Sequence, residues 1–94
     1  MAGHLVKTIR AEDTARIVPT LIEPDGTPYT GEFTACVVRH GVRPVAGDYQ
    51  ATEDVDGKPG ILVSGLSVGI YDIWAHVDVT PQHLNIPCGQ LSVA

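Results

Sequence analysis

The sequence predicts an all-β fold, an antiparallel β-sandwich of about seven short strands that forms a single domain over residues 1–94. Three observations favour this fold class. Apolar and polar residues alternate through 71–79, which is the two-residue period of a strand with one buried face. Clusters of Gly, Pro and Asp that favour turns recur between short apolar runs. No stretch of ten or more residues has the 3.6-residue period of an amphipathic helix.

Size and composition narrow the class of protein. With 94 residues, 44% of them hydrophobic and 18% charged, the chain has room for one domain and is too apolar to be disordered. It contains no apolar run near the ~20 residues of a membrane helix. It also lacks a charged start that leads into an apolar signal segment. We therefore expect a soluble protein that has neither a membrane partner nor a secretion signal.

The charge balance disfavours nucleic acid as a partner. Six Lys and Arg residues against eleven Asp and Glu residues give a net charge of −5, and no basic cluster could neutralise several phosphates. Basic residues lie mainly in the first half, whereas acidic residues concentrate in 48–56. This asymmetry either orients neighbouring copies in an assembly or marks a solvated acidic loop.

The first quarter of the chain predicts two strands. Residues 4–10 are rich in β-branched and aliphatic side chains and too few for a helix, so they indicate a strand or a pairing arm, with the arm covering residues 1–10. Small and acidic residues at 11–15 fit a helical turn, and 16–22 resumes the strand composition. Pro19 cannot donate to a ladder, which places that strand near an edge or a bulge.

A reversal and a third strand follow. Residues 23–28 combine prolines with Asp25 and Gly26, and these types favour a tight turn: proline sets φ, Asp bonds its own backbone and Gly accepts a positive φ. Residues 33–40 then predict a strand, which a loop through Gly47 ends.

The second half predicts four more strands. Residues 49–55 form a weaker strand, the turn-forming residues 56–60 reverse the chain, and 61–63 form a short apolar strand. The alternating strand 71–79 comes next. Residues 81–85 are expected to break the run, and a last strand covers 86–93.

Two cysteines, Cys36 and Cys88, are the only ones in the chain. Neither belongs to a Cys-x-x-Cys pair, which excludes a metal cluster built on thiolates. A disulfide between strands would suit a secreted sandwich, but the sequence shows no signal segment. We therefore expect reduced, half-buried thiols.

A short motif resembles the entry to a late strand of immunoglobulin-like and fibronectin-like sandwiches. It is the spacing Leu-x-x-Gly-x-Tyr-x-Ile within residues 66–73. In such sandwiches the glycine permits a corner and the tyrosine hydroxyl bonds to backbone upstream. The resemblance implies that Gly69 and Tyr71 have these roles, and that the fold is an antiparallel immunoglobulin-like β-sandwich.

A wider resemblance covers nearly the whole chain. The sequence is similar to small Ig-like bacteriophage virion proteins related to the N-terminal domain of siphophage upper baseplate proteins, although Glu12 stands where a glycine is usual and the central region is short. The motifs that carry it occur in this order: Arg10-Ala11-Glu12-Asp13-Thr14, Asp25-Gly26-Thr27-Pro28, Thr30-Gly31-Glu32-Phe33, Gly69-Ile70-Tyr71 and Gly89-Gln90-Leu91-Ser92-Val93.

The wider resemblance implies a function without catalysis. The expected protein is a capsid decoration or minor capsid protein that docks on the particle surface, and a tail or baseplate-associated role is the alternative. Its partners would be other virion proteins and copies of itself. It would reside in the virion after assembly in the cytoplasm of the host bacterium.

Few residues suggest chemistry. Asp72 and Asp78 share a strand face but are about 20 Å apart at ~3.4 Å per residue, well beyond the ~5 to 9.5 Å of paired glycosidase carboxylates. His76 and Asp78 are close enough for a weak surface pair. The other histidines lack a metal-ligand spacing, and 54–57 fits a turn better than a calcium loop. We therefore expect no enzyme activity, no cofactor, no metal site and no small-molecule substrate.

The predicted interface consists of Leu5, Val6, Trp74 and His76. Trp74 lies on the polar face of its strand, where it is either an exposed anchor for a partner or a side chain covered by a loop such as 41–48. Two further hypotheses remain open at this point. One is a small-ligand or carbohydrate-binding module, and the other is a compact hydrolase that uses His76 and Asp78.

Overall fold

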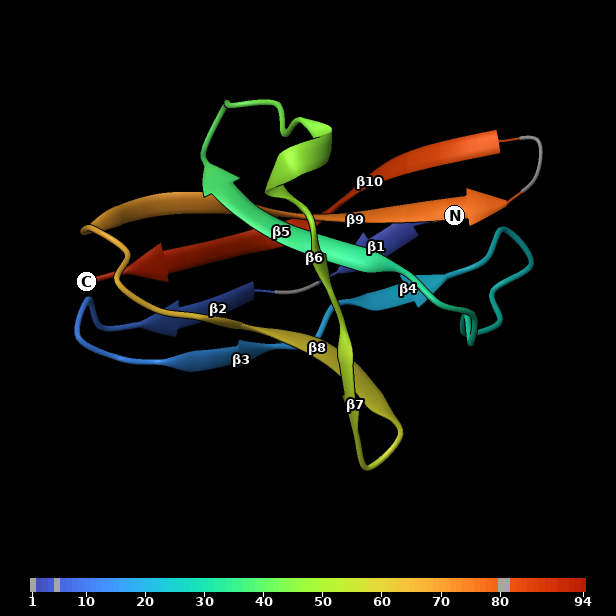
Figure 1. Cartoon of the computed structure of the whole chain (residues 1–94), viewed down its shortest axis with the longest axis horizontal. Coiled ribbons are helices and arrows are strands. Elements are labelled where there is room, and N and C mark those ends of the chain that lie inside the picture. Colours follow the sequence, from blue (N-terminus) through green and yellow to red (C-terminus); the bar gives the residue numbers. More distant parts are fainter. Residues whose placement is uncertain (1, 5, 80–81) are drawn as a thin grey trace.

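The computed structural model describes residues 2–4, 6–79 and 82–94. These residues form ten strands and one short 3₁₀ helix, so the predicted all-β class is confirmed (Figure 1). The elements are β1 (Ala2–His4), β2 (Val6–Ile9), β3 (Ala15–Ile17), β4 (Thr20–Ile22), β5 (Thr34–Arg39), η1 (Ala46–Asp48), β6 (Gln50–Ala51), β7 (Glu53–Val55), β8 (Lys58–Val63), β9 (Gly69–Val79) and β10 (Gln82–Val93).

The strands form one large sheet and two smaller ones. The large sheet has the order β2-β10-β9-β5-β6, and the smaller sheets have the orders β3-β8-β7 and β1-β4. Its two longest strands, β9 and β10, run side by side as an antiparallel pair (Figure 1). No helix among the described residues is long and apolar enough to cross a membrane.

There are more strands than predicted because three predicted strands each divide between two sheets. The segment 4–10 belongs to β1 and β2, 16–22 to β3 and β4, and 49–55 to β6 and β7. Pro19, which is buried, lies between β3 and β4 and has no N–H to continue a ladder. The chain therefore changes partner there, from β8 to β1.

The prediction of a purely antiparallel fold is wrong at one pair. β2 runs parallel to β10, from Val6 opposite Gln90 to Ile9 opposite Val93. A parallel pair needs a long connection between its strands, and here nearly the whole chain lies between them. The N-terminal segment is thus no free arm, since β1 pairs with β4 and β2 with β10 of the same chain. Leu5 lies outside the described residues.

The predicted break over 81–85 is also wrong where the structure describes it. Gln82–Asn85 belong to β10 and continue the pairing with β9, while Pro81 lies outside the described residues. Within β10, Pro87 is tolerated because β2 pairs only with the end of this strand, which leaves one side of Pro87 without a ladder partner. A bulge between Pro87 and Gly89 adjusts the register.

The core contains the apolar face that the alternation predicts on β9. Tyr71, Ile73, Ala75 and Val77 are buried there, and Ile73 is fully enclosed. Complete burial of such a side chain contributes about 1.5–3 kcal/mol. Other buried residues lie in or beside strands of all three sheets: Ile9, Ala15, Ile17, Leu21, Phe33, Ala35, Ile61, Val63, Ile86, Cys88, Leu91 and Val93.

Two turns use the residues that the sequence singles out for them. The Tyr71 hydroxyl donates to the carbonyl of Ser67 at 2.9 Å, and Gly69 has a φ of +152° at this corner. In the earlier turn, Asp25 Oδ1 accepts from the backbone N–H of Thr27 at 3.0 Å. Gly26 follows Asp25 with a φ of +89°, which a side chain would oppose.

Gly60 generates a prediction for the packing of β8 against β3. A Cβ added there would lie 2.6 Å from the carbonyl oxygen of Ile17 and 2.9 Å from Val18 Cγ2. Gly60→Ala should therefore lower the free energy of unfolding by about 1–3 kcal/mol in urea titrations, because backbone must move to admit the methyl group. Gly47→Ala is the control, since nothing lies within 4 Å of a Cβ at Gly47. Equal stability of the two variants would contradict this packing.

Candidate functional site

The outer face of the large sheet contains the main concentration of polar side chains. Asp72, Trp74, His76 and Asp78 alternate with the buried residues of β9, as expected. The register of the hairpin then places Asn85 of β10 opposite His76, and His83 opposite Asp78. Directly opposed residues of antiparallel strands project to the same side, so β10 adds two polar groups to this face.

We call Tyr49, His76, Asp78, His83 and Asn85 the outer-face cluster. Both histidines contact one carboxylate oxygen, Asp78 Oδ1, which lies 2.9 Å from His76 Nε2 and 2.5 Å from His83 Nδ1. On the other side of the His76 ring, Nδ1 donates to Asn85 Oδ1 at 2.8 Å. The Tyr49 hydroxyl donates to the same Asn85 oxygen at 3.0 Å. The cluster is therefore a continuous hydrogen-bonded chain.

The cluster shifts the pKa of two of its members in opposite directions. The hydrogen bond to Asn85, together with Asp78, raises the pKa of His76, because both acceptors favour the protonated ring. The hydrogen bonds from His83 and His76 lower the pKa of Asp78. Solvent reaches the outer-face cluster, since the side chains of Asp78 and His83 are 64% and 75% exposed.

The same arrangement brings metal-ligand atoms together. His76, Asp78 and His83 each offer one ligand atom, and these three atoms lie within 4.8 Å of one another. The sequence-based expectation that the histidines are too scattered to share a site therefore does not hold for His76 and His83. Spacing along the chain could not show this, because the two residues lie on different strands of a hairpin.

Of the two predictions for Trp74, the structure favours a side chain covered by other residues over an exposed anchor for a partner. Its side chain is half-buried, and its Nε1 is buried without a hydrogen-bond partner among the described residues. Cys36, directly opposite on β5, is 1% exposed although it lies on this outer face. Tyr49, which directly follows the predicted covering loop 41–48, supplies cover nearby, because its ring centroid lies 5.4 Å from that of His76.

Asp72 holds the start of this covering segment. Its Oδ1 accepts from His40 Nδ1 at 2.9 Å, and its Oδ2 accepts from the backbone N–H of Gly41 at 3.0 Å. Burial would raise the pKa of Asp72, but the hydrogen bonds from His40 and Gly41 outweigh it and lower the pKa. Asp72 thus has a structural role at the turn that leaves β5.

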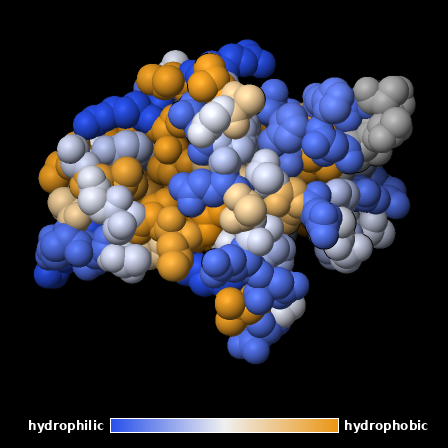
Figure 2. Space-filling view, in the orientation of Figure 1, coloured by the Kyte–Doolittle hydropathy of each residue, from blue (hydrophilic) through white to orange (hydrophobic). Residues whose placement is uncertain are grey.

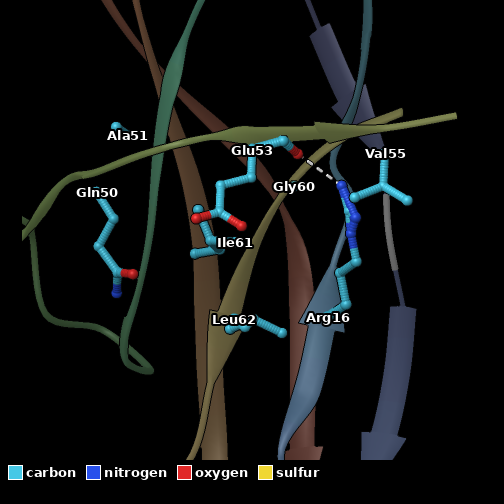
Figure 3. Close-up of a pocket in the computed structure, with 8 residues that line it drawn as sticks. All are labelled: Arg16, Gln50, Ala51, Glu53, Val55, Gly60, Ile61 and Leu62. Atoms are coloured by element: carbon cyan, nitrogen blue, oxygen red, sulfur yellow. Dashed lines mark hydrogen bonds between the residues drawn. The ribbon is translucent and has the colours of Figure 1, made fainter. Parts of the chain in front are cut away.

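A hollow of about 250 Å³ between β3, β8 and the β6–β7 segment is built around Arg16 (Figure 3). The guanidinium of Arg16 donates to the carbonyl oxygen of Glu53 at 2.6 Å and to that of Lys58. These bonds attach the β7–β8 turn region to β3, so the charge of Arg16 is engaged with backbone. The lining residues are Arg16, Gln50, Ala51, Glu53, Val55, Gly60, Ile61 and Leu62.

A larger open groove of about 810 Å³ adjoins the outer-face cluster. His76 and Asp78 form part of its wall, and Tyr29 contributes an aromatic side chain. The Tyr29 hydroxyl donates to the carbonyl of Glu32 at 3.0 Å, which holds this ring beside the 30–32 segment. The groove and the cluster are therefore parts of one polar surface.

Both cysteines are free thiols, as the sequence predicts. They are more deeply buried than expected, with Cys36 1% and Cys88 0% exposed. Burial raises the pKa of each thiol to about 11.

The predicted interface residues are only partly brought together. Trp74 and His76 share the outer face of β9. Val6, 73% exposed, is on the same face but at the edge strand β2, because it pairs with Gln90, which lies opposite Asp72. Tyr49, His83 and Asn85 were not predicted as site residues. The signal for the last two was the alternation of apolar Leu84, Ile86 and Cys88 with polar residues, which continues through the segment interpreted as a break.

We expect acid to weaken the contact at Asp72. A carboxylate whose pKa is lower in the folded than in the unfolded state stabilises the fold at pH values above 3.8, its ordinary pKa. This contribution is lost as the pH falls through the folded pKa. The carboxyl of Asp72 should therefore titrate below 3.8 by NMR. The Asp72→Asn variant should lose less stability than the parent between pH 5 and pH 2. A midpoint at or above 3.8 would contradict the hydrogen bonds described.

We expect both thiols to resist alkylation in the folded state. At pH 8 a thiol with a pKa of about 11 is almost entirely protonated, and burial excludes the reagent. Iodoacetamide followed by mass spectrometry should show slow labelling of the native chain and fast labelling in urea. Equal rates in both conditions would show that Cys36 and Cys88 are accessible.

Comparison with known proteins leaves the family open. No protein-family model, curated protein or solved structure matches the chain.

Proposed function

We propose that the protein is a non-enzymatic interaction module with an immunoglobulin-like β-sandwich fold. The strand order supports this fold, because β2-β10-β9-β5-β6 forms one layer and the strands β3-β8-β7 and β1-β4 supply the opposite one. The bond from the Tyr71 hydroxyl to the Ser67 carbonyl matches the tyrosine corner of such sandwiches.

We further propose that this module is a phage virion structural protein. The ordered turn motifs from Arg10 to Val93 support it through their similarity to small Ig-like virion proteins. A capsid decoration or minor capsid role, on the particle surface, is the primary proposal, and a tail or baseplate role is the alternative. The partners would be capsid or tail subunits.

The observation that carries the docking proposal is the open edge at β2. This strand is the terminal strand of the large sheet and pairs only with β10 among the described strands. Val6 on β2 is 73% exposed, more than any other exposed large hydrophobic residue among those described. A free strand edge with an apolar side chain suits the addition of a strand from a neighbouring subunit.

Elsewhere the exposed apolar residues are dispersed. On the face that Figure 2 shows, hydrophobic side chains are interleaved with hydrophilic ones. The exposed large hydrophobic residues besides Val6 are Val42, Val45, Val55, Leu62, Val68 and Ile70. Val42, Val45 and Val68 lie outside the strands, and Leu62 and Ile70 lie on strands that are paired on both sides. Val55 is on β7, which is also a terminal strand, but it is 52% exposed against 73% for Val6. Of these residues, Val6 is therefore the most exposed one on a strand edge.

The docking proposal can be tested with Val6→Lys. The substitution should change the free energy of unfolding by less than about 0.5 kcal/mol, because the side chain is exposed. It should lower the number of copies on gradient-purified particles at least about tenfold, which corresponds to about 1.4 kcal/mol of lost association. Mass spectrometry of the particles measures the copy number.

Val68→Lys is the matched control, since Val68 is 66% exposed and lies outside the strands. It should be incorporated like the parent. Absence of the parent protein from purified particles would contradict the virion role. Equal incorporation of the Val6 and Val68 variants would contradict docking through β2.

The groove favours a second candidate, the small-ligand or carbohydrate-binding module. Its volume of about 810 Å³ is in the range of ligand pockets, and Tyr29 offers a ring for stacking. Saturable binding of a glycan that Tyr29→Ala abolishes would favour this candidate over docking.

A further inference from the structure

The tip of the β9–β10 hairpin positions three side chains as a metal site would need them. His76 and Asp78 project from β9, and His83 faces Asp78 across the hairpin. We propose that His76 Nε2, Asp78 Oδ1 and His83 Nδ1 bind a divalent transition-metal ion, with Zn²⁺ as the best match. The proposal is independent of the docking function, because it concerns the tip of the hairpin and not the β2 edge.

The present distances are close to those of a bound ion. Around tetrahedral zinc, with ligand bonds of roughly 2.0–2.2 Å, neighbouring ligand atoms are roughly 3.4 Å apart. The separations from Asp78 Oδ1, 2.9 Å to His76 Nε2 and 2.5 Å to His83 Nδ1, are shorter, and all three ligand atoms lie within 4.8 Å of one another. Insertion of the ion therefore needs side-chain rotations that separate these atoms, while the paired strands keep the backbone in place.

Hydrogen bonding on the far side of His76 supports the assignment. Asn85 Oδ1 accepts from His76 Nδ1, so the proton of the neutral ring is on that nitrogen. The hydrogen bond from Nε2 to Asp78 Oδ1, at 2.9 Å, therefore needs a second proton on the ring; in the neutral ring Nε2 offers Asp78 a lone pair instead. A metal ion bound between the two atoms can take the place of that second proton. Asn85 would thus orient His76 as outer partners orient metal-binding histidines elsewhere.

The donor set selects the kind of ion. Two imidazoles with one carboxylate suit zinc, copper or nickel, whereas magnesium and calcium prefer oxygen ligands alone. Three protein ligands leave at least one coordination position for water or another ligand. His76 and Asp78 also line the groove of about 810 Å³, so a ligand on the ion has room there.

Calorimetric titration of the untagged full chain tests the proposal. After removal of metal with a chelator, ZnCl₂ at pH 7.5 should bind saturably with one ion per chain, and MgCl₂ should give no binding heat. His83→Ala and Asp78→Asn should each weaken zinc binding at least about tenfold, because each removes a ligand. Both residues are exposed, so thermal unfolding without metal should stay close to that of the parent.

His40→Ala is the matched control. His40 also pairs with a carboxylate, Asp72, at 2.9 Å, but no second histidine is part of that pair. This variant should bind zinc like the parent. In NMR spectra, zinc should shift the ring resonances of His76 and His83 and leave those of His40 unchanged. The proposal is overturned if zinc does not bind saturably, or if His40→Ala weakens binding as much as His83→Ala does.

Discussion

The pairing of β9 with β10 is the interaction on which the remaining structure depends. The two strands pair from Gly69 opposite Val93 to Val79 opposite Gln82. Since side chains alternate between faces, this one register directs Ile73 and Val77 into the core and His76 and Asp78 outward. A slip by one residue would exchange the two faces. Stability and surface chemistry are therefore set by the same pairing.

The two ends of β10 serve different purposes. Its C-terminal part, from Gln90 to Val93, accepts β2 in parallel and so creates the sheet edge that carries Val6. Its N-terminal part contributes His83 and Asn85 to the outer-face cluster. The bulge between Pro87 and Gly89 separates the two parts. The proposed docking edge and the polar cluster can therefore coexist on one strand, because they use different stretches of its length.

The candidate site shows where prediction from sequence fails. His76 and Asp78 could be paired in advance, since residues two apart on a strand share a face. His83 and Asn85 could not, because their segment looked like a proline-bordered break and their neighbours belong to another strand. Trp74 was ambiguous for a related reason. The alternation assigns its face, but only the folded chain determines whether a loop such as 41–48 covers that face.

The sequence alone determined the strand-rich class, the turns at Asp25 and Gly26 and at Asp56 and Gly57, and the buried face of β9. The second turn is shorter than the predicted 56–60, because 58–60 already belong to β8 and pair with β7. These features depend on local properties: the two-residue side-chain period and the backbone preferences of glycine, proline and aspartate. The tertiary structure alone decided the partners of each strand. The parallel β2–β10 pair and the cluster around Asp78 join residues that are distant in sequence, and backbone hydrogen bonds carry no residue identity that would reveal such pairs beforehand.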